Sequence, residues 1–462
     1  MRSSKSKMLH EIAGAPLLAY PISAAQELGA SPIVAVLGHQ LAEVTKVLQA
    51  RFGANTVTVV EQTEQKGTGH AVQLGLAGLE GFAGLVAILY GDVPLLTVDK
   101  LRQMVAAAQS SDGLVMLTAR VPNPAGYGRI VRDDAGHVRC ITEDRDTTPE
   151  QKGINEVNAG IYVAPVSFLR EATRNLLPQN AQGELYLTDI VAQAAASIGV
   201  ATIDVSAQEM SGINDREQLV QAESIMRSRI NARWLAHATI RSPETVFIDA
   251  DVVIDADAEI HANVALRGKT RIGAGTRVGM GCVLTDTIVG PGCDVLPYTV
   301  ATETTMGANC KVGPFAHLRP ASELGDDVHL GNFVETKKTK IGRGSKANHL
   351  SYLGDTVIGE KVNVGAGTIT CNYNGYQKQQ TIIEDGAFIG SDTQLVAPVR
   401  VGHIAIVAAG ATITQDVPAG ALAITRVAQT HLAGYAARLA ARYEDHAKTA
   451  AEKGKPRKAE TE

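Results

Sequence analysis

The sequence has little excess positive charge, few cysteines and no long hydrophobic run. Its 43 basic and 48 acidic side chains leave a net charge of −5, and such a chain lacks the positive field that binding to duplex nucleic acid requires. We therefore expect small molecules, and no nucleic acid, as partners. No stretch approaches the roughly 18 apolar residues of a membrane-spanning helix, and His10 and Glu11 interrupt the only amino-terminal segment that resembles a signal peptide. These absences predict a cytoplasmic protein without a transmembrane segment.

The cysteines and aromatic residues are also too few to organise the fold. Five cysteines are an odd number and form no C-x-x-C pair, which argues against a disulfide framework and a thiolate zinc site. Aromatic residues make up only 4% of the chain, and Trp234 is the single tryptophan. The cores must therefore be mostly aliphatic. At roughly 150 residues per domain, a chain of 462 residues predicts about three folding units.

The second half of the chain carries a repeat of aliphatic residues with a period of six. Its members are Ile248, Ile254, Ile260, Leu266, Ile272, Val278 and Leu284, then Met306, Val312, Leu318, Leu324 and Leu330, then Ile383, Ile389, Leu395, Val401, Val407 and Ile413. This period fits a coil whose flat faces each send one aliphatic side chain inward. The pattern predicts a parallel β-helix of hexapeptide repeats, which by itself is only a structural solenoid.

Polar residues interrupt the repeat and suggest chemistry. Val364 and Ile383 are 19 positions apart, one more than three hexads, so the winding must extrude a loop at this point. Basic residues beside a narrow prism, such as Arg319 and Lys337, favour an anionic substrate of the sugar-phosphate kind. A lone histidine is more often structural than catalytic, but polar residues surround His349 in the sequence, namely Lys337, Tyr352, Asn363, Asn372 and Tyr373.

The first half of the chain alternates strand-like and helical patterns. The expected strands are residues 33–38, 57–62, 85–92, 114–121 and 158–165, and the alternation predicts a mostly parallel sheet covered by helices. Ligands of such sheets bind at the carboxyl ends of the strands. Asp92 at such an end suits a magnesium ion, although an aspartate there is as often a helix cap. The glycines of Gly67-Thr68-Gly69 permit close approach of the backbone to a ligand.

The remaining segments set the domain boundaries. Residues 214–238 contain no proline or glycine and predict a linker helix. It separates an α/β domain over 1–213 from a β-helix over 239–426. Within 427–462, residues 427–445 have helical spacing and are expected to cover the last coil, and residues 446–462 are expected to form a disordered tail.

Several motifs together resemble the bacterial bifunctional N-acetylglucosamine-1-phosphate uridylyltransferase / glucosamine-1-phosphate N-acetyltransferase family over essentially the whole length. They are QKGTGH (65–70), YGDVP (90–94), PAGYGR (124–129), GIN (212–214), LRP (318–320), GNFVETKK (331–338), NHLSYLGD (348–355), GAGTITCNYNG (365–375) and IGSDTQLVAPV (389–399). The last four are highly specific.

The resemblance implies a Rossmann-like nucleotidyltransferase domain and a left-handed parallel β-helix that forms homotrimers. The β-helix half would acetylate glucosamine 1-phosphate with acetyl-CoA. The amino-terminal half would then join N-acetylglucosamine 1-phosphate to UTP, which yields UDP-N-acetylglucosamine, a precursor of cell wall and lipopolysaccharide, and pyrophosphate.

The family motifs also imply roles in the acetyltransferase half. A protonated amine cannot attack a thioester, so a neutral imidazole must take up a proton, and the motif places this base at His349. Asn372 and Ser391 would stabilise the oxyanion. The resemblance assigns the sugar phosphate to Arg319, Lys337, Tyr352 and Asn363, and acetyl-CoA to Ala366, Asn372, Tyr373, Ser391, Ala409 and Arg426.

In the amino-terminal half, the resemblance implies a Mg²⁺ ion at Asp92 and Asn214, where it would neutralise phosphate charge. It implies UTP and UDP-N-acetylglucosamine contacts at Lys7, Gln62, Gly67, Thr68, Tyr90, Gly91, Gly128, Glu143, Asn158 and Asn214. The family also begins with a buried strand and a glycine-rich phosphate loop, both of which would precede Met1. We therefore expect a misassigned start or a truncation, with acetyl transfer retained and uridylyl transfer weak.

Two other functions remain open from the residues. One is a sugar-nucleotide pyrophosphorylase whose β-helix is not catalytic, which would release pyrophosphate without consuming acetyl-CoA. The other is a non-catalytic sensor or assembly subunit, which predicts loss of the base and oxyanion residues. The presence of His349, Asn372 and Arg319 favours the bifunctional enzyme.

Overall fold

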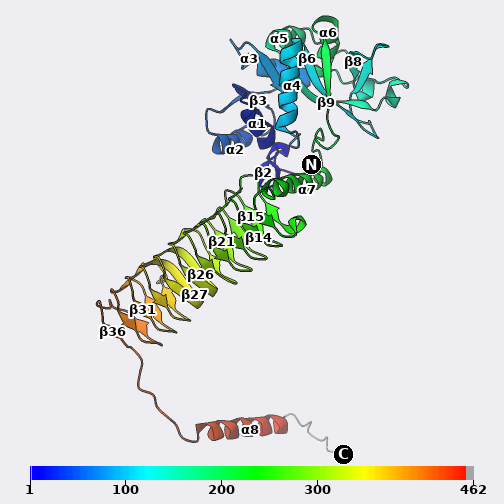
Figure 1. Cartoon of the computed structure of the whole chain (residues 1–462). Helices are drawn as coiled ribbons and strands as arrows, with labels where there is room; N and C mark the ends of the chain where they lie inside the picture. The colour runs from blue at the N-terminus through cyan, green and yellow to red at the C-terminus, as the bar shows by residue number, and fades with distance from the viewer. Residues whose placement is uncertain (2, 454–462) are drawn as a thin grey trace, which may run out of the picture.

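The computed structural model describes residue 1 and residues 3–453. Figure 1 shows an α/β domain, a long helix α7 (Arg216–Trp234) below it, and an elongated prism of short strands. A separate helix, α8 (Tyr435–Lys453), follows the prism. These parts follow one another in that order along the chain.

In its described residues, the α/β domain has ten strands and six α-helices. They are β1 (Glu11–Ile12), β2 (Ala15–Pro16), α1 (Ala19–Glu27), β3 (Ile33–Leu37), α2 (Leu41–Phe52), β4 (Val57–Glu61), α3 (Thr68–Ala77), β5 (Leu85–Ile88), α4 (Val98–Ser111), β6 (Leu114–Arg120), β7 (Arg129–Arg132), β8 (Val138–Thr142), β9 (Glu156–Pro165), α5 (Val166–Arg174), α6 (Ile190–Ser197) and β10 (Val200–Asp204).

The main sheet of this domain has the order β10-β6-β9-β7-β8, and β5 also pairs with β9. Helices α3, α5 and α6 pack on one face through residues such as Leu76, Leu169 and Val191. Helices α1 and α4 pack on the other face through Ala24 and Met104. The five expected strands are present.

The predicted mostly parallel order is wrong for part of this sheet. Strand β9 runs antiparallel to β5, β6 and β7. The reason is the antiparallel hairpin β7–β8, which returns the chain to the sheet without a helical crossover. Strands β3 and β4 pair with each other in parallel and form a sheet of their own, so the sheet is interrupted between β3 and β5.

The prism is a single parallel solenoid of 26 short strands. They are β11 (Thr239–Ile240), β12 (Phe247–Ile248), β13 (Val253–Ile254), β14 (Glu259–Ile260), β15 (Ala265–Arg267), β16 (Arg271–Ile272), β17 (Arg277–Val278), β18 (Val283–Thr285), β19 (Ile288–Val289), β20 (Asp294–Val295), β21 (Val300–Thr302), β22 (Thr304–Met306), β23 (Lys311–Val312), β24 (His317–Leu318), β25 (Ser322–Leu324), β26 (His329–Ile341), β27 (Lys346–Ile358), β28 (Asn363–Val364), β29 (Ile369–Cys371), β30 (Thr381–Ile383), β31 (Phe388–Ile389), β32 (Gln394–Val396), β33 (Val399–Val401), β34 (Ile406–Val407), β35 (Thr412–Ile413) and β36 (Leu422–Ala423).

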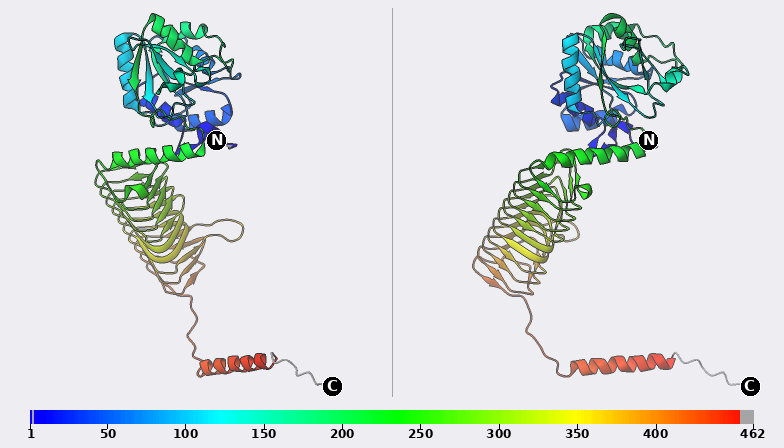
Figure 2. Two further views of the ribbon diagram at one scale, coloured as in Figure 1. Left: turned by 90° about the vertical axis from the view of Figure 1, so that its right-hand side faces the viewer. Right: turned by 45° about the vertical axis from the view of Figure 1, so that its right-hand side comes forward.

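Each coil of the solenoid has three faces, because a short strand typically pairs with the third strand after it. Most paired residues lie 18 or 17 positions apart, as in Leu266 with Leu284 and Leu330 with Ala347. The extruded loop raises this separation to 25 for pairs such as Thr356 with Thr381. Every aliphatic residue of the predicted hexad repeat is buried in one continuous core. The predicted β-helix is confirmed, and the expected loop after Cys371 projects from its side (Figure 2).

Helix α7 covers the first coils of the β-helix. Its N-cap is Asp215, whose side chain accepts a bond from the amide of Gln218. Its buried residues Ala222, Met226 and Ile230 join the same core as Ile248. The β1–β2 hairpin also touches this end, since the Ala13 carbonyl accepts a bond from the amide of Ala250 at 2.8 Å. The predicted linker helix is therefore also a cap.

The expected cap at the other end is not formed. Helix α8 begins at Tyr435 rather than at 427 and continues to Lys453, through part of the expected disordered tail. It lies away from the last coil (Figures 1 and 2), and residues 427–449 are all exposed. Its large apolar residues Tyr435, Leu439 and Tyr443 are all exposed. Residues 454–462 of the predicted tail lie outside the described residues.

Candidate functional site

One corner of the β-helix aligns four of the predicted site residues on successive coils. They are His349, Ala366, Ser391 and Ala409, which we call the His349 column. Backbone bonds link the coils at this corner, from the amide of Asp392 to the carbonyl of Ala366 and from the amide of Gly410 to that of Ser391. Arg426 extends the column, because its Nη1 donates to the carbonyl of Ala409 at 3.0 Å.

His349 is held by the coil that precedes it. Strands β26 and β27 pair in parallel so that Asn332 lies opposite His349, and the His349 Nδ1 is 3.3 Å from the Asn332 Oδ1. An amide oxygen only accepts hydrogen bonds, so this contact favours the neutral tautomer that carries its proton on Nδ1. The lone pair is therefore on Nε2, and because the His349 side chain is exposed, a neutral imidazole can take up a proton from a bound substrate.

A cluster of positive charge lies on the face that follows this corner. The face consists of residues 351–354 and the residues stacked on them in earlier coils, and we call it the Tyr352 face. Arg319 donates to Glu335 on this face at 2.9 Å. The Lys378 ammonium, from the extruded loop, lies against Lys337 and lowers the pKa of the Lys337 side chain, with Arg319 adding to the effect. Three cations held this close favour an anionic ligand.

Asn372 and Tyr352 meet at the far edge of the same face. The Asn372 side chain is only 7% exposed and donates from Nδ2 to Oδ2 of Asp355 at 2.5 Å. A Cβ on Gly354 would lie 2.5 Å from the Tyr352 hydroxyl and 2.9 Å from the Asn372 Nδ2. Glycine is therefore required at 354 for these two polar groups to come together.

Within one chain, the predicted acetyltransferase residues do not all lie together. Left-handed corners at Leu350 and Asp355 bound the Tyr352 face, so His349 lies at one edge of the face and Asn372 at the other. Asn363 pairs with Lys346, before the Leu350 corner, and thus lies on the adjacent face. Tyr373 is 60% exposed within the loop.

In the α/β domain, the two predicted metal ligands lie together with Lys7 between them. The Lys7 Nζ donates to Oδ2 of Asp92 at 2.5 Å and to Oδ1 of Asn214 at 2.6 Å. The adjacent backbones are also joined, since the amide of Ile213 donates to the carbonyl of Asp92. A carboxylate and an amide oxygen are ligands that suit Mg²⁺, and the same two atoms hold the Lys7 ammonium ion.

The predicted nucleotide residues gather around the start of α3. The Gln62 Nε2 is 3.3 Å from the carbonyl oxygen of Gly67, and the Thr68 hydroxyl accepts a bond from the amide of Leu187. Gly67 has a φ of +106°, and a Cβ there would lie 2.6 Å from the Leu185 carbonyl oxygen, so this close turn requires glycine. Tyr90 and Gly91 lead from β5 to Asp92.

The predicted sugar residues Gly128, Glu143 and Asn158 also converge. The amide of Asn158 donates to the carbonyl of Gly128 at 2.9 Å, and a Cβ on Gly128 would be 3.5 Å from the Glu143 carboxylate. Burial raises the pKa of Glu143, while the hydroxyl of Thr188, which donates to it at 3.0 Å, opposes this rise. A carboxylate in this position can accept bonds from sugar hydroxyl groups.

Sequence reasoning missed three residues that hold the predicted ones in place. Asn332 orients His349, Glu335 pairs with Arg319, and Asp355 accepts from Asn372. The signal for them was the coil length, because the two members of each pair lie 16 or 17 residues apart. One coil of three hexads places such residues side by side.

Comparisons with known proteins match both halves of the chain. Residues 1–152 match the model of a MobA-like NTP transferase domain, and residues 243–341 match that of a GMPPB C-terminal domain. A Bifunctional protein GlmU from Sorangium cellulosum is 49% identical, over 97% of this chain and 96% of its own. Those of Anaeromyxobacter sp. and Trichlorobacter lovleyi are 48% and 46% identical, over 95% and 94% of this chain and 90% and 95% of theirs.

Of the helices in the described part of the chain, none is long and apolar enough to cross a membrane.

Proposed function

The chain belongs to the GlmU family of bifunctional proteins, and from that premise we propose how its residues divide the work of two reactions. The chain is an enzyme with acetyltransferase and nucleotidyltransferase activity. The β-helix acetylates glucosamine 1-phosphate with acetyl-CoA, and the α/β domain transfers UMP from UTP to the N-acetylglucosamine 1-phosphate so formed. We place both reactions in the cytoplasm, where acetyl-CoA and UTP are the available substrates.

In acetyl transfer, His349 is the general base. Its Nε2 takes the proton from the substrate amine as the nitrogen attacks the thioester carbonyl. The carbon–sulfur bond then breaks, and the imidazolium gives this proton to the leaving sulfur, so that CoA departs as the thiol. Asn332 keeps the proton on Nδ1, so that Nε2 faces the substrate as the acceptor. A positioned base of this kind accelerates a reaction by roughly 10² to 10⁴.

The two substrates approach from different elements. Arg319 and Lys337 bind the sugar phosphate, and Tyr352 and Asn363 bind the sugar. Acetyl-CoA lies along the His349 column, past Ala366 and Ser391 to Ala409 and Arg426, with Tyr373 beside it. The small side chains of this column leave room along the corner for a thin, extended ligand. Ser391 and Asn372 are the donors to the oxyanion.

The active unit is a homotrimer. This proposal is supported by the way the site residues are divided over two faces of one chain. His349 and Asn372 lie at opposite edges of the Tyr352 face, and Asn363 lies beyond the Leu350 corner. A neighbouring copy can bring the missing groups beside His349. An exposed stack of Tyr298, Phe315 and Phe333, with ring centroids 5.2 and 5.7 Å apart, continues the same corner and offers an apolar contact surface.

In the α/β domain, Asp92 and Asn214 hold Mg²⁺, which neutralises phosphate charge when bound. Among the described residues, no group of three or more histidine, cysteine or acidic side chains gathers to hold a metal ion. Phosphate oxygens would therefore complete the coordination. Lys7 leaves the two oxygen ligands and pairs with a phosphate. Gln62, Gly67, Thr68, Tyr90 and Gly91 bind the nucleotide, and Gly128, Glu143 and Asn158 bind the sugar.

The observation that carries the acetyltransferase assignment is the alignment of His349 with Ala366, Ser391 and Ala409 on one corner, set by the pairing of β27 with β28 and by the backbone bonds of the following coils. We would measure thiol release from acetyl-CoA with glucosamine 1-phosphate as acceptor. His349→Ala should lower kcat by about 10² to 10⁴. His403→Ala, at an exposed residue of another corner, should leave it unchanged. Release of pyrophosphate from UTP without any thiol release would favour the rival pyrophosphorylase, and absence of both reactions would favour the non-catalytic subunit.

A further inference from the structure

The histidine of the QKGTGH motif has no part in the two proposed reactions, yet it contacts a residue of the proposed nucleotide site. His70 lies in the first turn of α3 and is partly buried. Its Nδ1 atom is 3.3 Å from the Nε2 atom of Gln62, the residue that follows β4. The contact therefore affects which atom of the Gln62 amide is left for a ligand.

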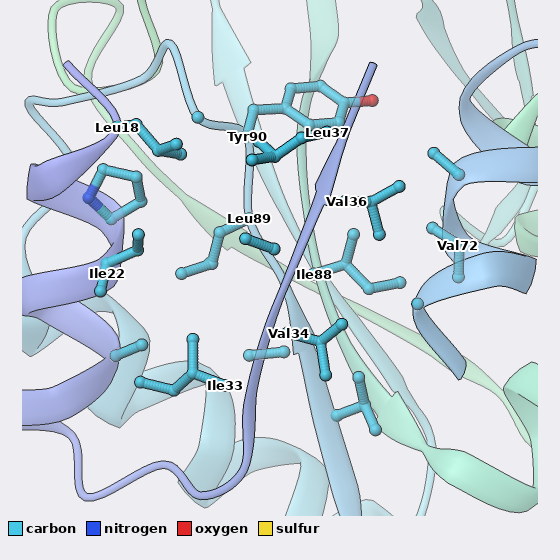
Figure 3. Close-up of a pocket in the computed structure, with 18 of the residues that line it drawn as sticks. Leu18, Ile22, Ile33, Val34, Val36, Leu37, Val72, Ile88, Leu89 and Tyr90 are labelled. Atoms are coloured by element: carbon cyan, nitrogen blue, oxygen red, sulfur yellow. The ribbon is translucent and has the colours of Figure 1, made fainter. Parts of the chain in front are cut away.

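Gln62 lies near one end of an apolar cavity of the α/β domain that several nucleotide residues line. The cavity has a volume of about 780 Å³, and its lining includes Thr68, Tyr90 and Gly91. Figure 3 shows Leu37, the last residue of β3, near the same end of the cavity as Tyr90. The amide of Gln62 donates to the carbonyl of Leu37 at 2.8 Å, which places Gln62 beside this end.

Both N–H groups of the Gln62 side chain are used within the protein. A carboxamide has two N–H donors on its nitrogen and an oxygen that only accepts. The carbonyl oxygen of Gly67, 3.3 Å from Nε2, also only accepts, so this contact fixes the amide with its nitrogen toward Gly67. The second N–H serves the contact with His70 Nδ1, which favours the neutral imidazole that carries its proton on Nε2.

The oxygen of the same amide is left for a ligand. No described residue forms a hydrogen bond with the Gln62 Oε1 atom, and the side chain is partly exposed. Because Gly67 and His70 hold Nε2, the oxygen cannot exchange places with the nitrogen unless two hydrogen bonds are lost. Gln62 therefore offers a nucleobase an acceptor and no donor.

An acceptor without a donor discriminates between the two pyrimidine bases. In a nucleotide, the uracil ring carries one donor, N3–H, between the carbonyl oxygens O2 and O4. Cytosine has a bare N3 acceptor in that place, and its lone pair would face the lone pairs of Gln62 Oε1. The hydroxyl of Thr68 accepts from the amide of Leu187 at 3.1 Å, so its own proton is available for one of the flanking uracil oxygens.

We propose that His70 is a positioning residue that makes the nucleotide site select uracil over cytosine, because it holds the Gln62 amide with its oxygen toward the base. The inference rests on the proposed function, in which Gln62 contacts the nucleotide. His70 acts through Gln62 and not on the base itself. A site built in this way rejects a base that leaves its polar groups unpaired.

Nucleotide binding by the full chain tests the proposal through the ratio of two dissociation constants. The Kd values for UTP and CTP are measured by isothermal titration calorimetry in the presence of Mg²⁺, and the unaltered chain should bind UTP more tightly. His70→Leu frees the Gln62 amide to turn, so UTP binding should weaken about tenfold while CTP binding changes little. His137→Leu, at an exposed residue between β7 and β8, is the control and should preserve the ratio.

A matched pair of polar variants separates positioning from packing. His70→Asn places an amide oxygen at about the position of the imidazole Nδ1 and should keep the preference for UTP. His70→Gln places its polar atoms near the position of Nε2 and should lose the preference, as His70→Leu does. With the unaltered chain, 3-methyl-UTP, whose N3 carries no proton, should bind no more tightly than CTP.

Three results would overturn the proposal. They are equal weakening of UTP and CTP binding by His70→Leu, which is the result of a merely structural role, loss of the UTP preference in His70→Asn, and equal binding of UTP and CTP by the unaltered chain. If the unaltered chain binds neither nucleotide, the proposed nucleotide site fails together with this inference. If it prefers UTP and His70→Leu leaves the ratio unchanged, only the inference about His70 fails.

Discussion

The Nδ1 atom of His349 lies 3.3 Å from the Oδ1 atom of Asn332, one coil earlier in the β-helix. This contact fixes the ring and leaves Nε2 free, so Asn332 is a positioning residue for the proposed base. We expect Asn332→Ala to lower kcat for acetyl transfer by about tenfold to a hundredfold with little change in KM.

The variant Asn332→Asp tests the positioning role, because a merely structural role for Asn332 would not predict a shift of the pH–kcat profile. Asn332→Asp keeps an acceptor for Nδ1 and adds a negative charge, which favours the protonated imidazole. The acidic limb of the pH–kcat profile should therefore move to higher pH, with kcat recovered at alkaline pH. An Asp variant with the profile of the unaltered chain would argue against the positioning role.

Lys337 should lose its charge at a lower pH than an ordinary lysine. The ammonium of Lys378 lowers the pKa of Lys337, so the affinity for glucosamine 1-phosphate should fall as the pH rises through this lowered pKa. Lys378→Met removes the repulsion and should shift the rise in KM to higher pH. Lys340→Met, on the same strand but paired with Glu323, is the control and should not move the profile.

Lys7 and a divalent cation should compete for the same two oxygen atoms. Because Lys7 donates to both Asp92 and Asn214, Lys7→Met should increase the affinity of the nucleotide-free chain for Mn²⁺, measured by the decrease of the free Mn²⁺ paramagnetic resonance signal. Lys5→Met, which removes only an exposed pair with Glu11, should not. Equal Mn²⁺ binding by the unaltered chain and Lys7→Met would show that the ammonium does not block the site.

The proposed trimer makes a prediction about mixed active sites. His349→Ala and Asn372→Ala should each be nearly inactive in acetyl transfer. If one copy supplies His349 and a neighbour supplies Asn372, co-expression of the two variants should restore part of the thiol release, because some interfaces then carry both intact residues. If the co-expressed variants sediment as trimers but show no recovery of thiol release, both residues belong to the site of one chain.

Truncation in the β-helix core should cost far more than truncation at its surface. Ile389 is fully buried, whereas Ile404 is 57% exposed. Ile389→Ala should lower the free energy of unfolding by about 2–5 kcal/mol, because it removes buried surface and leaves a void. Ile404→Ala should change it by less than about 1 kcal/mol. Denaturant titration followed by circular dichroism measures both.

The β-helix was predictable from the sequence because its constraint is strictly periodic. Each face of the coil is about six residues long and must point one aliphatic side chain inward, as at Leu266 or Val401. The resulting period of six can be read from the sequence alone. The long helix before it was predictable for a similar local reason, the absence of proline and glycine over 24 residues from Asp215 to Ala238.

Features that depend on contacts between distant residues were not predictable in the same way. The antiparallel direction of β9 depends on the β7–β8 hairpin, and the pairing of Asn332 with His349 depends on the exact length of a coil. The position of α8 away from the last coil is likewise visible only in the structure. Motif resemblance named His349 and Asn372, but only the structure places them at opposite edges of one face.

Most strand pairs of the β-helix join residues only 17 or 18 positions apart, and this has a consequence for how the β-helix assembles. Contacts of such short range give the domain a low contact order, and each coil needs only the previous one as a template. Helix α7 covers the first coils, while the described residues leave the last coil bare. Assembly should therefore start beneath α7 and proceed toward β36, and fraying under mild denaturant should begin at the carboxyl-terminal coils and move in the reverse direction.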